Sequence, residues 1–133
     1  MAAELERVKQ LIQDHHIEFI DLKTIDLVGR LHHITLPVRN DTLERLLEQG
    51  VGFDGSSFGF AKVESSDMVQ KPDLATAQID LFRDRPTLTC FTNVFLTDAN
   101  RSRFAQDVRW VARQAEELLQ SLGIADTTHW GPE

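Results

Sequence analysis

The apolar residues of this chain change their spacing several times, and this alternation limits the folds that it can adopt. Over residues 4–16 and 104–122, apolar side chains recur every three or four positions, which predicts two amphipathic helices. For the second helix the expected buried face comprises Val108, Val111, Ala112, Ala115, Leu118, Leu119 and Leu122. The residues between the two helices follow other periods and show no internal repeat, so the chain is neither all helical nor a repeat protein.

The segments between these helices have the spacing of strands. Residues 17–22 and 31–36 flank a turn at Gly29 and predict an antiparallel hairpin. Two more strands are expected at Thr76–Phe82 and Thr87–Thr97. The order helix, two strands, helix, loop, two strands, helix indicates one α+β domain, with about four strands in a mostly antiparallel or mixed sheet covered by helices.

A short helix is expected between the two pairs of strands. Asp41 can accept hydrogen bonds from the free N–H groups of the first turn, and Glu44 follows it at capping-box distance. The buried face of this helix is expected to comprise Leu43, Leu46 and Leu47. Gly50 supplies the left-handed position with which many helices end.

Charge and cysteine content exclude several classes of function. Lys and Arg together number 14 against 21 Asp and Glu, and the net charge of −7 argues against a nucleic acid or another polyanion as partner. The single cysteine, Cys90, excludes an intramolecular disulfide framework and a cysteine-based metal cluster. The apolar runs are too short to span a membrane, and Met1–Glu4 lacks the features of a signal peptide. We therefore expect a cytoplasmic protein without membrane or nucleic-acid partners.

The stretch Val51–Lys71 differs in kind because glycines alternate with serines in it, and we expect a long functional or mobile loop there. Within it, Asp54 is followed by Gly55, Ser56 and Ser57. A carboxylate beside hydroxyls makes an acceptor-rich pocket suited to a cation, ammonium included, and glycine lets the backbone approach a ligand. A plain surface turn explains the same residues, because Asp-Gly and Ser are common in turns.

The histidines are interpreted as surface or half-buried side chains. Neighbouring residues point to opposite faces of a strand and lie about 100° apart on a helix, so neither His15-His16 nor His32-His33 converges on one metal ion. Cys90 is expected to be a small buried apolar residue. The sequence contains no Ser-His-Asp pattern, phosphate-binding loop or dinucleotide fingerprint, so it matches none of these common catalytic and nucleotide-binding motifs.

Six short motifs, taken in order, resemble the N-terminal β-grasp domain of the glutamine synthetase family, from about Val8 to the last residue. They are Ile25-Asp26-Leu27-Val28-Gly29-Arg30 with His32-His33-Ile34-Thr35-Leu36-Pro37, Gly52-Phe53-Asp54-Gly55-Ser56-Ser57, Glu64-Ser65-Ser66-Asp67-Met68 with Lys71-Pro72-Asp73, Thr76 to Asp80, Asp107-Val108-Arg109, and Gly131-Pro132-Glu133. The last looks like the first half of the family's G-P-E-x-E-F motif. Any one of these motifs is weak evidence, whereas all of them in family order and at family spacing form a specific signal.

The resemblance implies a ligase as the parent enzyme. In that family a small β-grasp domain precedes a larger catalytic domain, and glutamate is joined to ammonium with ATP and Mg²⁺ or Mn²⁺ through γ-glutamyl phosphate. The active site lies between neighbouring subunits of a ring, so other synthetase subunits are the implied partners. Residues 1–16 would then be an N-terminal helix, 17–100 the β-grasp domain, and 101–133 a linker helix with the first residues of the catalytic domain.

The resemblance also assigns roles to four residues. Asp54 would bind ammonium and favour its loss of a proton, with Ser57 beside it. Asp67 would lie in a loop near the neighbouring active site, and Glu133 would be the first metal-binding carboxylate, in keeping with the preference of magnesium for oxygen ligands. Neither ATP nor the metal is expected to bind tightly to this chain alone, because their remaining ligands would lie beyond Glu133.

The chain also departs from the family pattern. The segment from Ser57 to Phe60 is one residue shorter than the family's S-S-I-x-G-F, which would reposition the tip of the loop. Leu81 and Val108 replace family prolines and change local rigidity. Most of the catalytic domain is absent, so we expect the isolated chain to make no glutamine. The alternative interpretation is a stand-alone β-grasp module that docks on a full-length synthetase or another partner.

Overall fold

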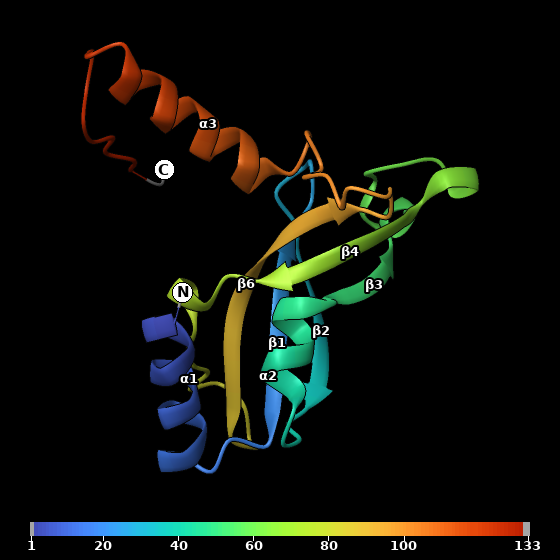
Figure 1. Ribbon diagram of the computed structural model, residues 1–133, viewed down its shortest axis with the longest axis vertical. Helices are drawn as coiled ribbons and strands as arrows, with labels where there is room; N and C mark the ends of the chain where they lie inside the picture. The colour runs from blue at the N-terminus through green and yellow to red at the C-terminus, as the bar shows by residue number, and fades with distance from the viewer. Residues whose placement is uncertain (1, 132–133) are drawn as a thin grey trace.

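The computed structural model describes residues 2–131, which form a six-stranded sheet with three α-helices (Figure 1). In chain order the elements are α1 (Ala2–Asp14), β1 (Phe19–Ile25), β2 (Leu31–Pro37), α2 (Thr42–Glu48), β3 (Val51–Asp54), β4 (Asp67–Pro72), β5 (Gln78–Ile79), β6 (Thr87–Leu96) and α3 (Val108–Ser121). Short 3₁₀ turns occupy Gly55–Phe58, Val63–Ser65 and Leu74–Thr76.

The sheet is mixed, with the strand order β2-β1-β6-β4-β3 and β5 paired with β6. β1 and β6 run parallel, with Leu22 beside Cys90, whereas β1–β2, β3–β4, β4–β6 and β5–β6 are antiparallel. The expected α+β class is therefore confirmed, and so is the expected hairpin, in which Ile25 pairs with Leu31 across the turn. The two end strands of this order, β2 and β3, each pair with a single neighbour.

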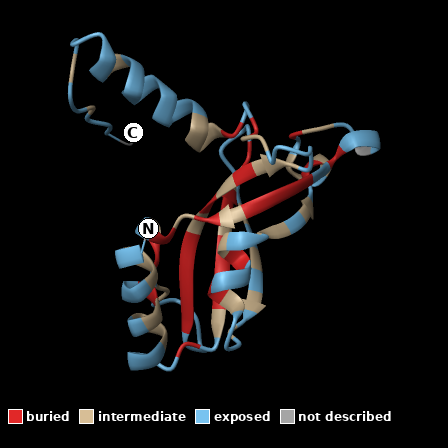
Figure 2. Ribbon diagram, in the orientation of Figure 1, coloured by how far each residue is buried: buried red, intermediate tan, exposed pale blue. Residues whose placement is uncertain are grey.

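The main core lies between the sheet and the two helices α1 and α2. Figure 2 shows the buried residues concentrated in β1, β4 and β6. The core cluster comprises Val8, Ile17, Ile20, Leu22, Leu43, Leu46, Leu74, Ala77, Leu88 and Cys90. A second, smaller cluster comprises Phe60, Met68, Val94 and Phe104, with Phe53 and Phe58 packed against it. Because Phe53 and Phe58 flank Asp54, this second cluster supports the segment that carries the candidate site.

The expectation of a long loop over Val51–Lys71 is wrong, because two strands, β3 and β4, account for much of this stretch. β3 has four residues, of which only Val51 and Phe53 are apolar, so its own alternation is too short to detect. β4 is buried at Met68, Val69 and Gln70 although its sequence does not alternate. Both strands form because β6 provides an edge for β4, and tertiary pairing of this kind commonly overrides local propensity.

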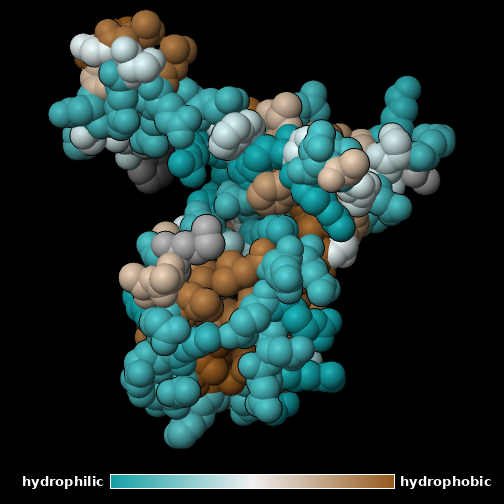
Figure 3. Space-filling model, viewed as in Figure 1, coloured by the Kyte–Doolittle hydropathy of each residue, from teal (hydrophilic) through white to brown (hydrophobic). Residues whose placement is uncertain are grey.

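The C-terminal helix also differs from the expectation in its start and in its surroundings. It begins at Val108 rather than at Phe104, because Asp107 caps it by accepting a hydrogen bond from the backbone N–H of Arg109. All of α3 lies in the described part of the chain, and none of its side chains is buried. The helix projects away from the sheet (Figure 1), and apolar side chains gather at its free end (Figure 3), where Leu122 and Ile124 are exposed.

Two smaller expectations need correction. The side chain of Asp41 makes no capping hydrogen bond on α2; instead, the Thr42 hydroxyl accepts one from the backbone N–H of Arg39 at 2.7 Å. The strand expected over Thr76–Phe82 shrinks to the two residues of β5, because a 3₁₀ turn precedes them. The predicted burial of Leu43 and Leu46 and the left-handed conformation of Gly50 are both confirmed.

A buried carboxylate, Asp21, lies on β1 between the core residues Ile20 and Leu22 and therefore faces the other side of the sheet. It accepts hydrogen bonds from Thr35 Oγ1 at 2.6 Å and Arg83 Nη2 at 3.0 Å, and His33 Nδ1 lies 2.8 Å away. Burial alone would raise the pKa of Asp21, but the bonds from Thr35, His33 and Arg83 together hold this pKa below its usual value.

We expect this ionised carboxylate to make the stability of the domain fall in acid. A carboxyl with a lowered folded-state pKa stabilises the fold above its unfolded pKa of about 3.9, and the contribution is lost as the pH falls through the folded-state value. Asp21→Asn should lower the unfolding free energy at pH 7 by about 2 kcal/mol, typical of hydrogen bonds to charged groups. Urea unfolding from pH 7 to 3 should show this difference shrinking, and parallel curves for the two proteins would contradict the expectation.

Candidate functional site

Asp54 is the last residue of β3 and precedes the 3₁₀ turn Gly55–Phe58. The backbone N–H of Gly55 donates to the Ser66 carbonyl at 2.7 Å, which ties this turn to the residue before β4. A Cβ atom at Gly55 would lie 2.6 Å from Met68 Sδ, so only glycine lets the backbone lie this close to the second core cluster. The predicted Gly-Ser segment is therefore a fixed turn on a packed support.

The Asp54 carboxylate is exposed and held by serines. Its Oδ1 atom accepts hydrogen bonds from the backbone N–H of Ser56 at 2.8 Å and from Ser56 Oγ at 2.7 Å. Its Oδ2 atom has a longer bond, 3.4 Å, from Ser57 Oγ. Hydrogen bonds from Ser56 first, then from Ser66 and Ser57, hold the pKa of Asp54 below its usual value. The carboxylate is thus ionised at neutral pH and exposed to a cationic donor.

Asp67 lies directly opposite Asp54, because these two residues are partners in the register of β3 and β4. Side chains of directly opposed residues in an antiparallel pair are close neighbours, so two exposed carboxylates concentrate negative charge at this end of the sheet. The structure thus places Asp67, which was expected in a loop, on β4 opposite Asp54, while the Ser57 hydroxyl lies 3.4 Å from Asp54 Oδ2. The fourth predicted site residue, Glu133, lies outside the described residues.

Sequence reasoning missed the aromatic surroundings of this turn. His32, interpreted as a surface or half-buried side chain, is partly buried and stacks on Phe58, with ring centroids 4.2 Å apart. Phe58 in turn contacts Phe53 at 4.8 Å and Phe60 at 5.9 Å. The one signal in the sequence was at Phe58, where the chain departs from the family loop. The contact between Phe58 and His32 joins residues far apart in the sequence, so no local pattern indicates it.

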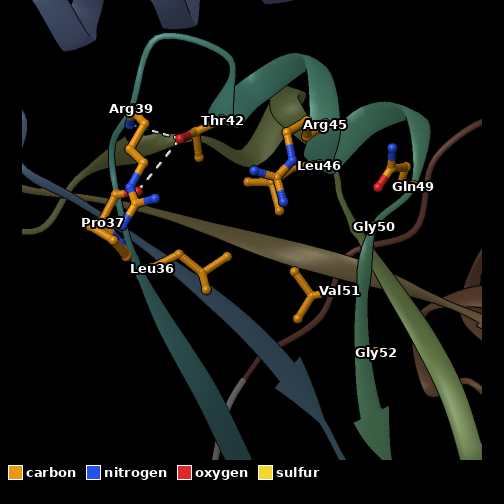
Figure 4. Close-up of a pocket in the computed structure, with 10 residues that line it drawn as sticks. All are labelled: Leu36, Pro37, Arg39, Thr42, Arg45, Leu46, Gln49, Gly50, Val51 and Gly52. Atoms are coloured by element: carbon orange, nitrogen blue, oxygen red, sulfur yellow. Dashed lines mark hydrogen bonds between the residues drawn. The ribbon is translucent and has the colours of Figure 1, made fainter.

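Neither of two clefts near α2 includes Asp54, Ser56 or Ser57 in its lining. One, of about 430 Å³, lies between α2 and the facing ends of β2 and β3, where Leu36, Leu46 and Val51 lie below Arg45 (Figure 4). The other, of about 490 Å³, lies between α1 and α2. A substrate pocket generally encloses most of its ligand. The exposed Asp54 turn lies outside both clefts.

Other features of the described chain limit the chemistry available to it. Within residues 2–131 no three His, Cys, Asp or Glu side chains are placed to hold a metal ion. Cys90 is buried as expected, and burial raises the pKa of its thiol to about 12, so it is not a reactive thiolate. No helix in the same residues is long and apolar enough to cross a membrane.

Comparisons with known proteins agree on one family. Residues 16–97 match the family described as glutamine synthetase, beta-Grasp domain. The chain is 39% identical over 125 residues to the glutamine synthetase of Pseudomonas aeruginosa and 41% identical over 125 residues to that of Azotobacter vinelandii. Each alignment covers 93% of this chain but 26% of the relative, so the chain spans about a quarter of the length of these relatives.

Solved structures show the same fold at lower identity. A glutamine synthetase structure from Plasmodium falciparum superposes with a TM-score of 0.75 at 22% identity, covering 92% of this chain and 23% of that one. A structure of GmaS in complex with ADP gives a TM-score of 0.73 at 15% identity, covering 85% of this chain and 25% of that one. At these identities the likeness concerns the fold alone.

Proposed function

The chain belongs to the glutamine synthetase β-grasp domain family, and we propose that it is the N-terminal, ammonium-side part of such a synthetase. The family match and the mixed sheet confirm the β-grasp fold expected from the sequence. The observation that carries the proposal is the Asp54 carboxylate, which is ionised, exposed and held on a fixed turn that two clefts of the domain do not reach. Such a turn suits a site completed by a neighbouring subunit in the parent enzyme.

The chemistry proposed for this turn is recognition of ammonium. Asp54 Oδ2 accepts an N–H bond from the cation, and the Ser57 hydroxyl helps to orient it. A carboxylate beside ammonium also receives or directs the proton that the nitrogen must lose before it can attack an acyl group. Asp67 adds negative charge that favours a cation at this end of the sheet. In the parent enzyme the acceptor is glutamate activated by ATP, so the overall reaction is ATP-dependent ligation.

We propose that Mg²⁺ or Mn²⁺ and ATP bind in other parts of the parent enzyme. Within residues 2–131 no three His, Cys, Asp or Glu side chains are placed to hold a metal ion, and the family motif implies that the remaining ligands lie beyond Glu133. We propose Glu133, which lies outside the described residues, as one ligand of this metal. We further propose that the parent is an oligomer of like subunits in the cytoplasm.

A stand-alone module that docks on a full-length synthetase is the second candidate function. The observation that favours it is that the described residues form two clusters of buried apolar side chains of their own. In this case the turn at Asp54 would occupy the same kind of surface on a partner without the chain being covalently part of that enzyme.

A chimera tests the proposed function directly. We expect that replacing the aligned N-terminal quarter of the Azotobacter vinelandii synthetase with this chain gives a protein that forms glutamine from glutamate, ammonium and ATP. The isolated chain, and the synthetase without its N-terminal quarter, should form none. A correctly folded and assembled chimera without activity would contradict the proposal. Co-purification of the free chain with an intact synthetase, combined with an inactive chimera, would favour the docking module.

A further inference from the structure

We propose that His32 is a positioning residue, whose ring holds Phe58 and through it the turn that presents Asp54. The inference rests on the proposed function only for the role of Asp54, and its geometry stands on the described contacts alone. His32 is on β2 and Phe58 follows β3, which are the two end strands of the sheet order. Their stacked rings, inclined by 16°, therefore connect the two ends of a curled sheet.

The ring of His32 is itself held in place by the β1–β2 hairpin. Its Nε2 lies 2.9 Å from Oδ2 of Asp26, a buried carboxylate at the start of the hairpin turn. The other oxygen of Asp26 accepts hydrogen bonds from the backbone N–H groups of Val28 and Arg30. The bond from His32 is the largest cause that lowers the pKa of Asp26, so the carboxylate is ionised and the histidine nitrogen donates. This bond fixes the plane of the ring.

Phe58 connects the fixed ring of His32 to the turn that carries Asp54. It is the last residue of the 3₁₀ segment, and its ring contacts both His32 and Phe53. Phe53 directly precedes Asp54, so the two phenylalanines hold the turn on either side of the carboxylate. Phe60 continues the series into the second core cluster, where its ring lies 5.2 Å from that of Phe104. Stacked and edge-on aromatic pairs of this kind stabilise beyond their buried area.

The orientation of Asp54 depends on the conformation of this turn. Its Oδ1 atom bonds to the N–H and the hydroxyl of Ser56, which lie within the 3₁₀ segment. If the segment opens, those bonds are lost together, and the carboxylate can rotate away from the direction in which it would meet a cation. Losing the stack on Phe58 should therefore loosen the turn and raise the pKa of Asp54 toward its usual value.

Two substitutions at His32 separate the ring from the hydrogen bond. His32→Gln can keep the bond to Asp26 but has no ring, whereas His32→Phe keeps a ring over Phe58 without the bond. His33→Gln is the matched control, since His33 neighbours His32 on β2 but contacts Asp21 instead. In the 133-residue chain, NMR should report amide exchange at Ser56, Gly59 and Phe60 and the pKa of Asp54, with urea unfolding as the measure of global stability.

We expect His32→Gln to speed exchange at these amides about fivefold, which is the change that the loss of one aromatic pair would produce. The same variant should raise the pKa of Asp54. His32→Phe should speed exchange by no more than about twofold, because it keeps the ring contact with Phe58 and loses only the bond that fixes the plane of the ring. His33→Gln should leave the turn unchanged even where it lowers global stability. Unchanged exchange and pKa in His32→Gln, equal changes in His33→Gln, or failure of His32→Phe to preserve the turn would each overturn the inference.

None of these measurements involves ammonium, ATP or a partner subunit. An inactive chimera beside the expected NMR result would therefore remove the proposed function and leave the positioning role intact. An active chimera together with an unchanged turn in His32→Gln would support the proposed function and remove the positioning role of His32.

Discussion

Replacing Asp54 with alanine in the active chimera should lower kcat/KM for ammonium by about 10²–10⁴-fold, the range attributed to a positioned acid–base group. The reaction rate should fall most at low ammonium concentration, because in the proposed role the same carboxylate would also bind the cation. Stability should change little, since Asp54 is exposed and its bonds are local to one turn. Steady-state rates of phosphate release across ammonium concentrations measure the effect.

Asp98 offers a matched control for this substitution. It is also an exposed aspartate, two residues after the end of β6, and it too accepts a hydrogen bond from a serine backbone N–H, that of Ser102 at 2.8 Å. Both carboxylates have a lowered pKa because of such bonds. Asp98→Ala thus removes a similar turn cap outside the Asp54 segment, next to Thr97, whose hydroxyl donates to the Asp67 carbonyl at 3.2 Å, and it should leave kcat/KM unchanged. Equal losses in the two variants, or full activity in Asp54→Ala, would remove the ammonium role from Asp54.

The parts of the fold that were predictable are those with a local signal. The β1–β2 hairpin follows from two alternating runs around Gly29, and α1 and α2 follow from apolar residues at helical spacing. Gly50 was recognisable as the left-handed residue after α2 because glycine is the usual choice there. In each case the information lies within a few neighbouring residues, which is the range over which periodicity operates.

The parts that were not predictable depend on distant partners. β4 carries Gln70 and Lys71 in its middle and becomes a strand because β6 and β3 lie on either side of it. The apolar stripe of α3 predicted burial, and the periodicity is real, but no surface of the described residues covers it. An amphipathic pattern shows that a face can be buried and does not identify what buries it.

The candidate site likewise has parts with a local sequence signal and parts that depend on distant residues. The residues Asp54, Ser56 and Ser57 were recognisable because glycine, aspartate and serine together indicate a turn with free acceptors. The position of Asp67 beside Asp54 depends on the register of β3 and β4, which the sequence alone did not provide. The support from His32 depends on the curl that brings the two end strands of the sheet together.

The second large effect concerns the end of α2, where Gly50→Ala should destabilise the domain severely. Gly50 has φ of 73°, a conformation that costs an L residue energy, and an added Cβ would lie 2.5 Å from Val69 Cγ1 and 2.7 Å from the Gln70 carbonyl oxygen. Val69 and Gln70 are buried in β4, so neither can move aside easily. Left-handed strain and overpacking together should cost about 3 kcal/mol. That is a large part of the roughly 5–15 kcal/mol that stabilises a typical domain.

Gly29→Ala separates the two causes of this loss. Gly29 has a similar φ of 83°, but no atom among the described residues lies within 4 Å of its added Cβ. The backbone strain is therefore matched and the steric conflict is absent, so Gly29→Ala should cost only about 1 kcal/mol. Urea unfolding of the two variants beside the parent chain gives both free energies under one set of conditions. Equal losses would show that strain alone accounts for Gly50, and that α2 does not pack against β4 as tightly as its geometry requires.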